Sequence, residues 1–299
     1  MIEESTGIPA AHVEKDFWVT EALRAAAARA ASEKTTIVFK GGTSLSKAHR
    51  LIRRFSEDID LLVVVPGDSK DAADRCLKAI TAAVGKALGV EGAVDATTAT
   101  KGRKRTTCFE YPVRHRQGGL RPSVLLELGA RGGTLPAEAM TIGSLIAENG
   151  RDVGLDMGFE EAASFQIRVL HTARTLVEKL MILHHAAVLG DRAERIRLAR
   201  HYYDVWCLLN DASTLSALTV WPCDALAREV ETFTIAAGLD TSPRPSGGFG
   251  ASPAFSARTR AVREAYQRQV LDQLVWGPAE EKPTLDECCD LVVATGTSL

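Results

Sequence analysis

The sequence predicts an α+β fold for the first half of the chain and a mostly helical second half. The β-branched, apolar runs TTIVF (35–39) and DIDLLVVV (58–65) are typical of buried strands. Residues 11–31 and 69–88 have the composition and length of helices. From Thr172 onward only helical periodicity remains, so we expect one domain over 1–170 and a second over 171–299.

The remaining elements follow from local pattern and turn residues. A short helix is expected to run from Thr43 or Ser44, either of which could cap it, to Arg54. Further strands are expected at 106–113 and 122–130, joined by a turn at Gln117-Gly118-Gly119, and at 165–170. The second half has four helical stretches, at 172–189, 191–209, 222–238 and 256–275.

Composition narrows the class of protein. Hydrophobic residues make up 45% of the 299 residues and the formal net charge is −2, which excludes a disordered chain and a strongly basic chromatin-like protein. No apolar stretch is long enough to cross a bilayer, and MIEESTGIPA has no signal-peptide core. The six cysteines contain no C-x-x-C pair that would indicate zinc. We therefore expect a cytoplasmic protein with no membrane partner.

Two carboxylates are the strongest chemical signal. Asp58 and Asp60 are two residues apart on an expected strand, so both side chains lie on one face. Adjacent carboxylates repel each other, and a divalent cation relieves that repulsion. Because Mg²⁺ prefers oxygen ligands and often binds one or two carboxylates together with substrate phosphates, we expect a Mg²⁺ site here.

A glycine turn precedes this strand. Gly41-Gly42-Thr43 stands where a strand becomes a helix, and glycines together with a helix N-terminus can receive a phosphate. GGTSLSK is not a P-loop, because Lys47 has no glycine before it and no Ser or Thr after it. A phosphate site and a metal site are therefore expected on one strand–turn–helix–strand unit.

The order of these motifs resembles the polymerase-β-like nucleotidyltransferase fold. More of the chain resembles the AbiEii/AbiGii toxin family, which includes the MenT-like nucleotidyltransferases of toxin–antitoxin pairs. That resemblance rests on EKDFWVTEALR (14–24), FKGGTSLSKAH (39–49), FSEDIDLLV (55–63), RTLVEKLMILHH (174–185), RLARHYYDVWCLL (197–209) and the segment near 249–255. One position departs from the family: His201 stands where the fourth motif often has its first aspartate.

The resemblance implies a role for each matched position. Gly42, Thr43 and Ser44 would form the phosphate-binding turn, with Lys47 also binding nucleotide, and Asp58 and Asp60 would bind metal. Lys179 of the third motif would neutralise triphosphate charge, and Asp204 would be the acid of the fourth motif.

Several of these assignments have an ordinary structural alternative. The fold implies a third carboxylate from a neighbouring strand; Glu127 is the candidate and Glu110 the runner-up, although either could face outward from its strand. Lys179 could extend from a core helix to solvent. Arg197, Arg200 or His201, and Asp204 have the spacing of one helical stripe, which would also suit surface ion pairs.

Basic residues are concentrated between Lys101 and Arg121, where seven positive side chains accompany one acid. Lys101, Arg103, Lys104 and Arg105 begin this stretch and are candidate RNA contacts, although a solvated hairpin with no partner has the same composition.

The resemblance implies a toxin that transfers a nucleoside monophosphate from an NTP to an acceptor hydroxyl at the 3′ end of tRNA and so blocks translation. It also implies a cognate antitoxin. Two alternatives remain open: nucleotidylation of a protein or small molecule, and a catalytically silent module that binds nucleotide or RNA.

Overall fold

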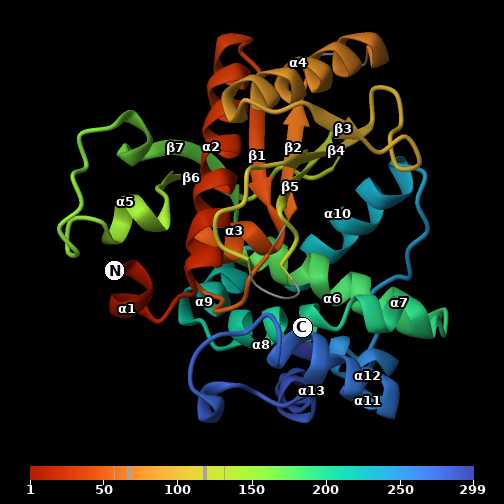
Figure 1. Cartoon of the computed structure of the whole chain (residues 1–299). Coiled ribbons are helices and arrows are strands. Elements are labelled where there is room, and N and C mark those ends of the chain that lie inside the picture. The colour runs from red at the N-terminus through yellow and green to blue at the C-terminus, as the bar shows by residue number, and fades with distance from the viewer. Residues whose placement is uncertain (57, 66–68, 117–119, 131) are drawn as a thin grey trace. The chain divides into compact units, whose positions relative to one another are not determined.

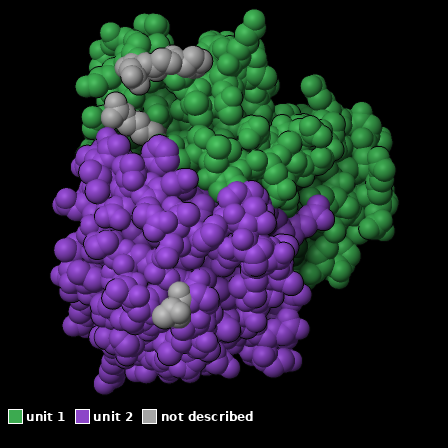
Figure 2. Space-filling model, turned by 180° about the vertical axis from the view of Figure 1, so that it is seen from behind, with its two compact units in different colours: residues 1–48, 55–170 green, residues 49–54, 171–299 purple. Residues whose placement is uncertain are grey.

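The computed structural model describes residues 1–56, 58–65, 69–116, 120–130 and 132–299 (Figure 1). They form two compact units, which are coloured separately in Figure 2. The first unit comprises residues 1–48 and 55–170, and the second comprises residues 49–54 and 171–299. Sequence analysis did not anticipate that the short segment 49–54 joins the helical unit.

The described part of the first unit contains a seven-stranded mixed sheet, which confirms the predicted α+β class. Its strands are β1 (Thr36–Lys40), β2 (Asp58–Val64), β3 (Gly92–Val94), β4 (Lys104–Glu110), β5 (Ser123–Gly129), β6 (Ala137–Ile142) and β7 (Phe165–Leu170), in the order β3-β4-β5-β2-β1-β7-β6. The sequence did not predict β3 or β6. The expected turn at Gln117-Gly118-Gly119 lies outside the described residues.

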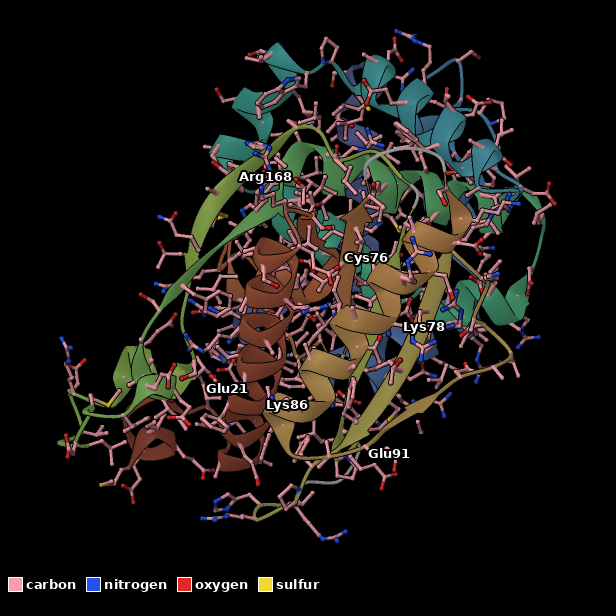
Figure 3. All side chains as sticks on the ribbon, turned by 90° about the horizontal axis from the view of Figure 1, so that it is seen from above. Glu21, Cys76, Lys78, Lys86, Glu91 and Arg168 are labelled. Carbon is pink, nitrogen blue, oxygen red and sulfur yellow. The ribbon has the colours of Figure 1, made fainter. Side chains whose placement is uncertain are left out.

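Helices cover one face of this sheet. The helices of the first unit are α1 (Ile2–Thr6), α2 (Ala10–Ser32), α3 (Gly41–Lys47), α4 (Lys70–Leu88) and α5 (Leu145–Asn149), with a 3-10 turn at Glu160–Ala162. Figure 3 shows α2 and α4 side by side over the strands. Their buried side chains, such as Leu23 and Ile80, pack with Phe39, Ile59 and Leu126 of the central strands. Because strand side chains alternate, the residues between these point to the opposite face.

The helix expected to run to Arg54 is shorter than predicted. α3 begins at Gly41 and ends at Lys47, and no side chain caps it. Neither Thr43 nor Ser44 is therefore the cap. Arg50 adopts a left-handed φ of +56°, which a continuing helix does not allow, and the following residues pack in the second unit. Tertiary contacts override the local helical pattern here.

The second unit is helical, as the sequence predicted. Its α-helices are α6 (Thr172–Val188), α7 (Arg192–Arg197), α8 (Arg200–Leu209), α9 (Ala212–Val220), α10 (Cys223–Ala236), α11 (Pro253–Ser256), α12 (Arg260–Ala265) and α13 (Leu285–Ala294). The described residues of this unit also form 3-10 turns at Phe249–Ala251, Ala279–Glu281 and Gly296–Ser298 and a π-helical segment at Tyr266–Leu271. α6 is buried on most of its surface and packs against α8, α10 and α11.

A capping box begins α13. The Thr284 hydroxyl accepts a bond from the Glu287 N–H at 3.2 Å, and the Glu287 carboxylate accepts one from the Thr284 N–H at 2.7 Å. Thr284→Ala removes the side-chain acceptor and should lower the free energy of unfolding by about 1 kcal/mol, whereas Thr284→Ser should retain it. Chemical denaturation measures both; equal losses in the two variants would contradict a capping role.

Candidate functional site: a carboxylate face and a buried charge cluster

Asp58 and Asp60 lie on the face of the sheet away from α2 and α4. In β2, Ile59, Leu61 and Val63 are buried in the core that those helices cover. The two aspartates alternate with these residues and are half-buried. The period-2 pattern therefore holds two carboxylates on one face of a strand whose other face is fixed by apolar packing.

Gly41 is shaped to the Asp60 carboxylate. It has a φ of +79°, and a Cβ built on it would lie 2.1 Å from Asp60 Oδ2. No side chain fits at that distance, so only glycine lets the turn between β1 and α3 approach this carboxylate. Gly42 is half-buried beside it.

The hydroxyl groups of the predicted phosphate turn have partners within the first unit. Thr43 is buried, and its Oγ1 donates to the backbone carbonyl of Asp58 at 2.5 Å. Ser44 is fully buried, and its Oγ donates to the Gly41 carbonyl at 2.9 Å. These bonds connect the turn to the start of β2. Gly41 and Gly42 are consequently the more accessible positions of the turn.

A row of polar residues crosses the central strands on this face. Lys40 of β1 is directly opposite Asp60, and Glu127 of β5 is directly opposite Asp60 on its other side. Directly paired residues of neighbouring strands share a face, so Lys40, Asp60 and Glu127 are neighbours across the sheet. The sequence analysis missed Lys40; its alternation with the buried Phe39 is the signal that could have found it.

Glu127 is the better placed of the two candidates for a third carboxylate. It is on the strand next to β2, whereas Glu110 is at the exposed end of β4, one strand further away. In this structure Glu127 pairs with Lys104 at 3.0 Å. Among the described residues, no three His, Cys, Asp or Glu side chains form a group that could hold a metal ion. Asp58 and Asp60 offer two carboxylates on one face, which is the type of ligand that Mg²⁺ prefers.

Lys47, which the resemblance assigns to nucleotide binding, forms an ion pair within the first unit. Its Nζ donates to Asp16 Oδ1 of α2 at 2.5 Å, and both side chains are largely buried. The other oxygen of Asp16 accepts the Leu145 N–H at 2.6 Å, at the start of α5. Lys47 therefore joins α3 to the rest of its unit.

A second polar site lies inside the helical unit. The Asp204 side chain has no exposed surface, and Arg54 binds it through two bonds, Nε to Oδ1 at 2.5 Å and Nη2 to Oδ2 at 2.7 Å. Lys179 Nζ also donates to Oδ2 at 2.7 Å. Lys179 is buried, so it neither reaches solvent nor projects freely from α6. The sequence motifs indicate Lys179 and Asp204, whereas Arg54 is predicted only as the end of a helix.

His201 completes this cluster. Its Nδ1 lies 3.2 Å from Lys179 Nζ and 3.5 Å from Asp204 Oδ2. The predicted stripe that also included Arg197 is interrupted, because α7 ends at Arg197 and α8 begins at Arg200. Arg197 instead pairs with Glu194 near the surface. Surface ion pairing is thus correct for Arg197 and wrong for Asp204.

Burial and charge shift the titration of this cluster in defined directions. Complete burial acts to raise the pKa of Asp204, but the charges of Arg54 and Lys179 outweigh it and hold the pKa well below its usual range. Burial lowers the pKa of Lys179 against the attraction of Asp204. Burial also lowers the pKa of His201 to about 3, and the Lys179 charge acts in the same direction. His201 is therefore a neutral imidazole at neutral pH.

The candidate RNA contacts are partly neutralised. Lys101 pairs with Asp71 at 2.7 Å, and Lys104 pairs with Glu127. Arg103 and Arg105 are half-buried. The positive charge counted along the sequence is therefore partly offset by acids from other elements.

The class of protein follows from a comparison with known families. The family described as nucleotidyl transferase AbiEii toxin, of type IV toxin–antitoxin systems, matches residues 22–279. This match covers most of the chain and includes both the carboxylate face and the charge cluster. The protein is thus a nucleotidyltransferase. It belongs to the AbiEii toxin family.

Solved structures show weaker similarity. The nucleotidyltransferase toxin MenT4 from Mycobacterium tuberculosis H37Rv is 17% identical, with 94% of this chain and 93% of that chain covered and a TM-score of 0.49. JHP933 from Helicobacter pylori is 14% identical over 94% and 93% of the two chains, with a TM-score of 0.37. Comparison with curated protein sequences gives no significant match.

Across the described ranges, none of the helices combines the length and apolar character needed to cross a membrane.

The charge cluster predicts a large stability effect at Arg54. Arg54→Met leaves the buried Asp204 with one cation fewer and should lower the free energy of unfolding by about 3–5 kcal/mol. The adjacent Arg53 is the matched control, because it is 63% exposed and pairs with the exposed Glu281. Arg53→Met should cost at most about 1 kcal/mol in the same denaturation experiment. Similar losses in the two variants would contradict a larger contribution of the buried ion pair to the free energy of unfolding.

His201 predicts a pH dependence of stability. Its pKa is about 3 in the folded protein and about 6.5 when unfolded, so between these values the unfolded chain binds more protons. Stability therefore falls as pH is lowered from 6.5 towards 3, with a slope from this group approaching about 1.4 kcal/mol per pH unit. The variant His201→Gln should flatten the slope between pH 6.5 and 5, above the range where Asp204 titrates. Denaturation midpoints measured across that range check this, and an unchanged slope would show that His201 is not buried in its neutral form.

Proposed function

We propose that the protein transfers a nucleoside monophosphate from an NTP to an acceptor hydroxyl and releases pyrophosphate, with Mg²⁺ as the cofactor. The observation that carries this proposal is the paired face of Asp58 and Asp60, closely approached by the Cβ-free turn at Gly41. Two carboxylates beside a glycine turn combine a cation site with room for a phosphate. Membership of a nucleotidyltransferase family supports the reaction class.

Asp58 and Asp60 would hold the metal, which when bound offsets the charge of the triphosphate and the acceptor oxygen. A bond forms between the acceptor oxygen and the α-phosphorus, and the bond from that phosphorus to pyrophosphate breaks. The acceptor hydroxyl loses its proton, and Glu127 is our candidate to receive it, since its register places it beside Asp60. Lys40, on the other side of Asp60, is suited to neutralising phosphate charge.

Lys179 and Asp204 have a positioning role in this proposal. They hold Arg54, and Arg54 precedes Asp58 by only four residues in the chain. The cluster therefore anchors the peptide that leads into the carboxylate strand, and we do not assign Lys179 a direct phosphate contact.

For the acceptor we propose the 3′ end of tRNA, whose modification would block translation. The basic residues from Lys101 to Arg105 support a nucleic-acid acceptor, because part of their charge remains exposed beside the acids that pair with them. The toxin–antitoxin family of the chain supports a cognate antitoxin as the protein partner.

A label-transfer assay tests the reaction. The purified protein is incubated with Mg²⁺, total RNA and each α-labelled NTP in turn. We expect label on a tRNA-sized band with at least one NTP. Asp60→Asn should reduce transfer at least a hundredfold, because the variant keeps the size of the side chain and loses a charged metal ligand. Gly41→Ala should reduce it comparably, since the new Cβ would collide with Asp60.

Gly89→Ala is the matched control. Gly89 also has a positive φ, of +66°, but it lies at the end of α4 with nothing within 4 Å of a built Cβ. This variant carries similar backbone strain and should keep its activity. Label on protein or small molecules in place of RNA would reassign the acceptor. If every fraction stayed unlabelled with every NTP, transfer would be excluded in favour of a silent nucleotide- or RNA-binding module.

A further inference from the structure

An aromatic pocket lies inside the helical unit. Its volume is about 300 Å³, which is the lower end of the range for small-ligand sites. Aromatic side chains from two parts of the unit line it: Tyr203 and Trp206 of α8, and Trp276 from the segment before Ala279–Glu281. Both tryptophans are half-buried, so part of each ring is accessible. Arg53, Glu281 and Lys282 complete its polar edge.

The charged groups of this pocket already have partners in the protein. Lys282 Nζ donates to the carbonyls of Val275 at 2.7 Å and Leu271 at 3.3 Å. Arg53 Nη1 pairs with Glu281 at 2.5 Å. A phosphate would have to displace these contacts and approach Glu281, whereas a flat, uncharged ring would not. The chemistry of the lining therefore favours a flat aromatic group over a phosphate.

Hydrogen bonds connect the walls of the pocket. The backbone N–H of Arg53 donates to the Tyr203 hydroxyl at 3.2 Å, and the backbone carbonyl of Arg53 accepts a bond from the backbone N–H of Trp276 at 3.0 Å. Arg54 and Val275 form an antiparallel bridge next to these bonds. Because Arg54 is itself held by Asp204, the wall formed by residues 53 and 54 is anchored to the buried cluster. Tyr203 and the backbone of Trp276 are therefore held in place before a ligand binds, which lowers the entropy cost of binding.

We propose that this pocket binds a nucleobase, stacked on Trp206 and Trp276. Every base presents a flat aromatic face, and base–aromatic stacking is the common way in which proteins bind unpaired nucleotides. The inference rests on the proposed function, since a nucleotidyltransferase handles two sources of bases: the NTP and the terminal nucleotide of a nucleic-acid acceptor. The base has the same flat aromatic face in both sources.

Tryptophan fluorescence tests binding separately from catalysis. The protein is titrated in EDTA, where Mg²⁺-dependent transfer cannot proceed, with each NTP in one arm and with a short single-stranded RNA in the other. We expect saturable quenching in at least one arm. Trp206→Ala and Trp276→Ala should each weaken binding about ten- to a hundredfold, and the Phe variants should retain most of it.

Trp221→Phe is the matched control. Trp221 belongs to the same unit, is 37% exposed and contacts His171 at a ring distance of 5.0 Å, but it does not line the pocket. Its loss should leave the dissociation constant unchanged. Denaturation midpoints verify that the variants fold, and the Phe variants provide a second comparison if an Ala variant does not.

The two arms identify the source of the base. Quenching that depends on the two tryptophans in the NTP arm assigns the pocket to the nucleotide, and the same result in the RNA arm assigns it to the acceptor. Dependence in both arms supports a site that accepts either source. Absence of binding in both arms, or binding that the Ala variants leave unchanged, would overturn the proposal. Failure of label transfer with intact quenching would instead refute the proposed reaction and leave the base site standing.

Discussion

The buried carboxylate of Asp204 is the constraint on which the helical unit depends. A charge without solvent contact is costly, and here Arg54 and Lys179 offset that cost by direct bonds to both oxygens. The three residues come from distant parts of the sequence, so the cluster forms only when α6, α8 and the segment 49–54 are all in place. Burial beside this cluster lowers the pKa of His201, and the Lys179 charge acts in the same direction. The bonds of Arg54 to Asp204 thus connect the segment 49–54 to the helices of this unit.

This dependence explains where local sequence reasoning succeeded and where it failed. Alternation correctly placed Asp58 and Asp60 on one face, because a strand with a buried apolar side has only one way to orient them. It could not show that Glu127 is in register with Asp60, since register is set by contacts between strands. The predicted extension of the helix to Arg54 was wrong for the same reason. The local pattern favours a helix, but α3 ends at Lys47 and Arg54 pairs with Asp204 in the helical unit.

The partners of the charged side chains were the hardest feature to predict from the sequence. Basic residues do outnumber acids between Lys101 and Arg121. However, Lys101 forms an ion pair with Asp71 and Lys104 with Glu127, and both acids belong to other elements. The structure also pairs Lys47 with the half-buried Asp16 and Lys179 with the buried Asp204, partners that the sequence pattern did not indicate. A sequence shows which residues are charged; which acid faces which base depends on tertiary contacts that periodicity does not contain.

The two units therefore offer different chemistry to a nucleotide. The first provides carboxylates and a glycine turn, which suit a cation and phosphates but distinguish poorly between bases. The second provides aromatic rings whose charged neighbours are already paired, which suits a base but offers little to a triphosphate. Residues 49–54 lie between α3 and β2 in the sequence, although they belong to the helical unit. Two of them, Leu51 and Arg53, line the aromatic pocket. In our proposal the base is bound by Trp206 and Trp276 and the metal by Asp58 and Asp60, so substitutions at the two tryptophans should change the affinity for the base without removing a proposed metal ligand.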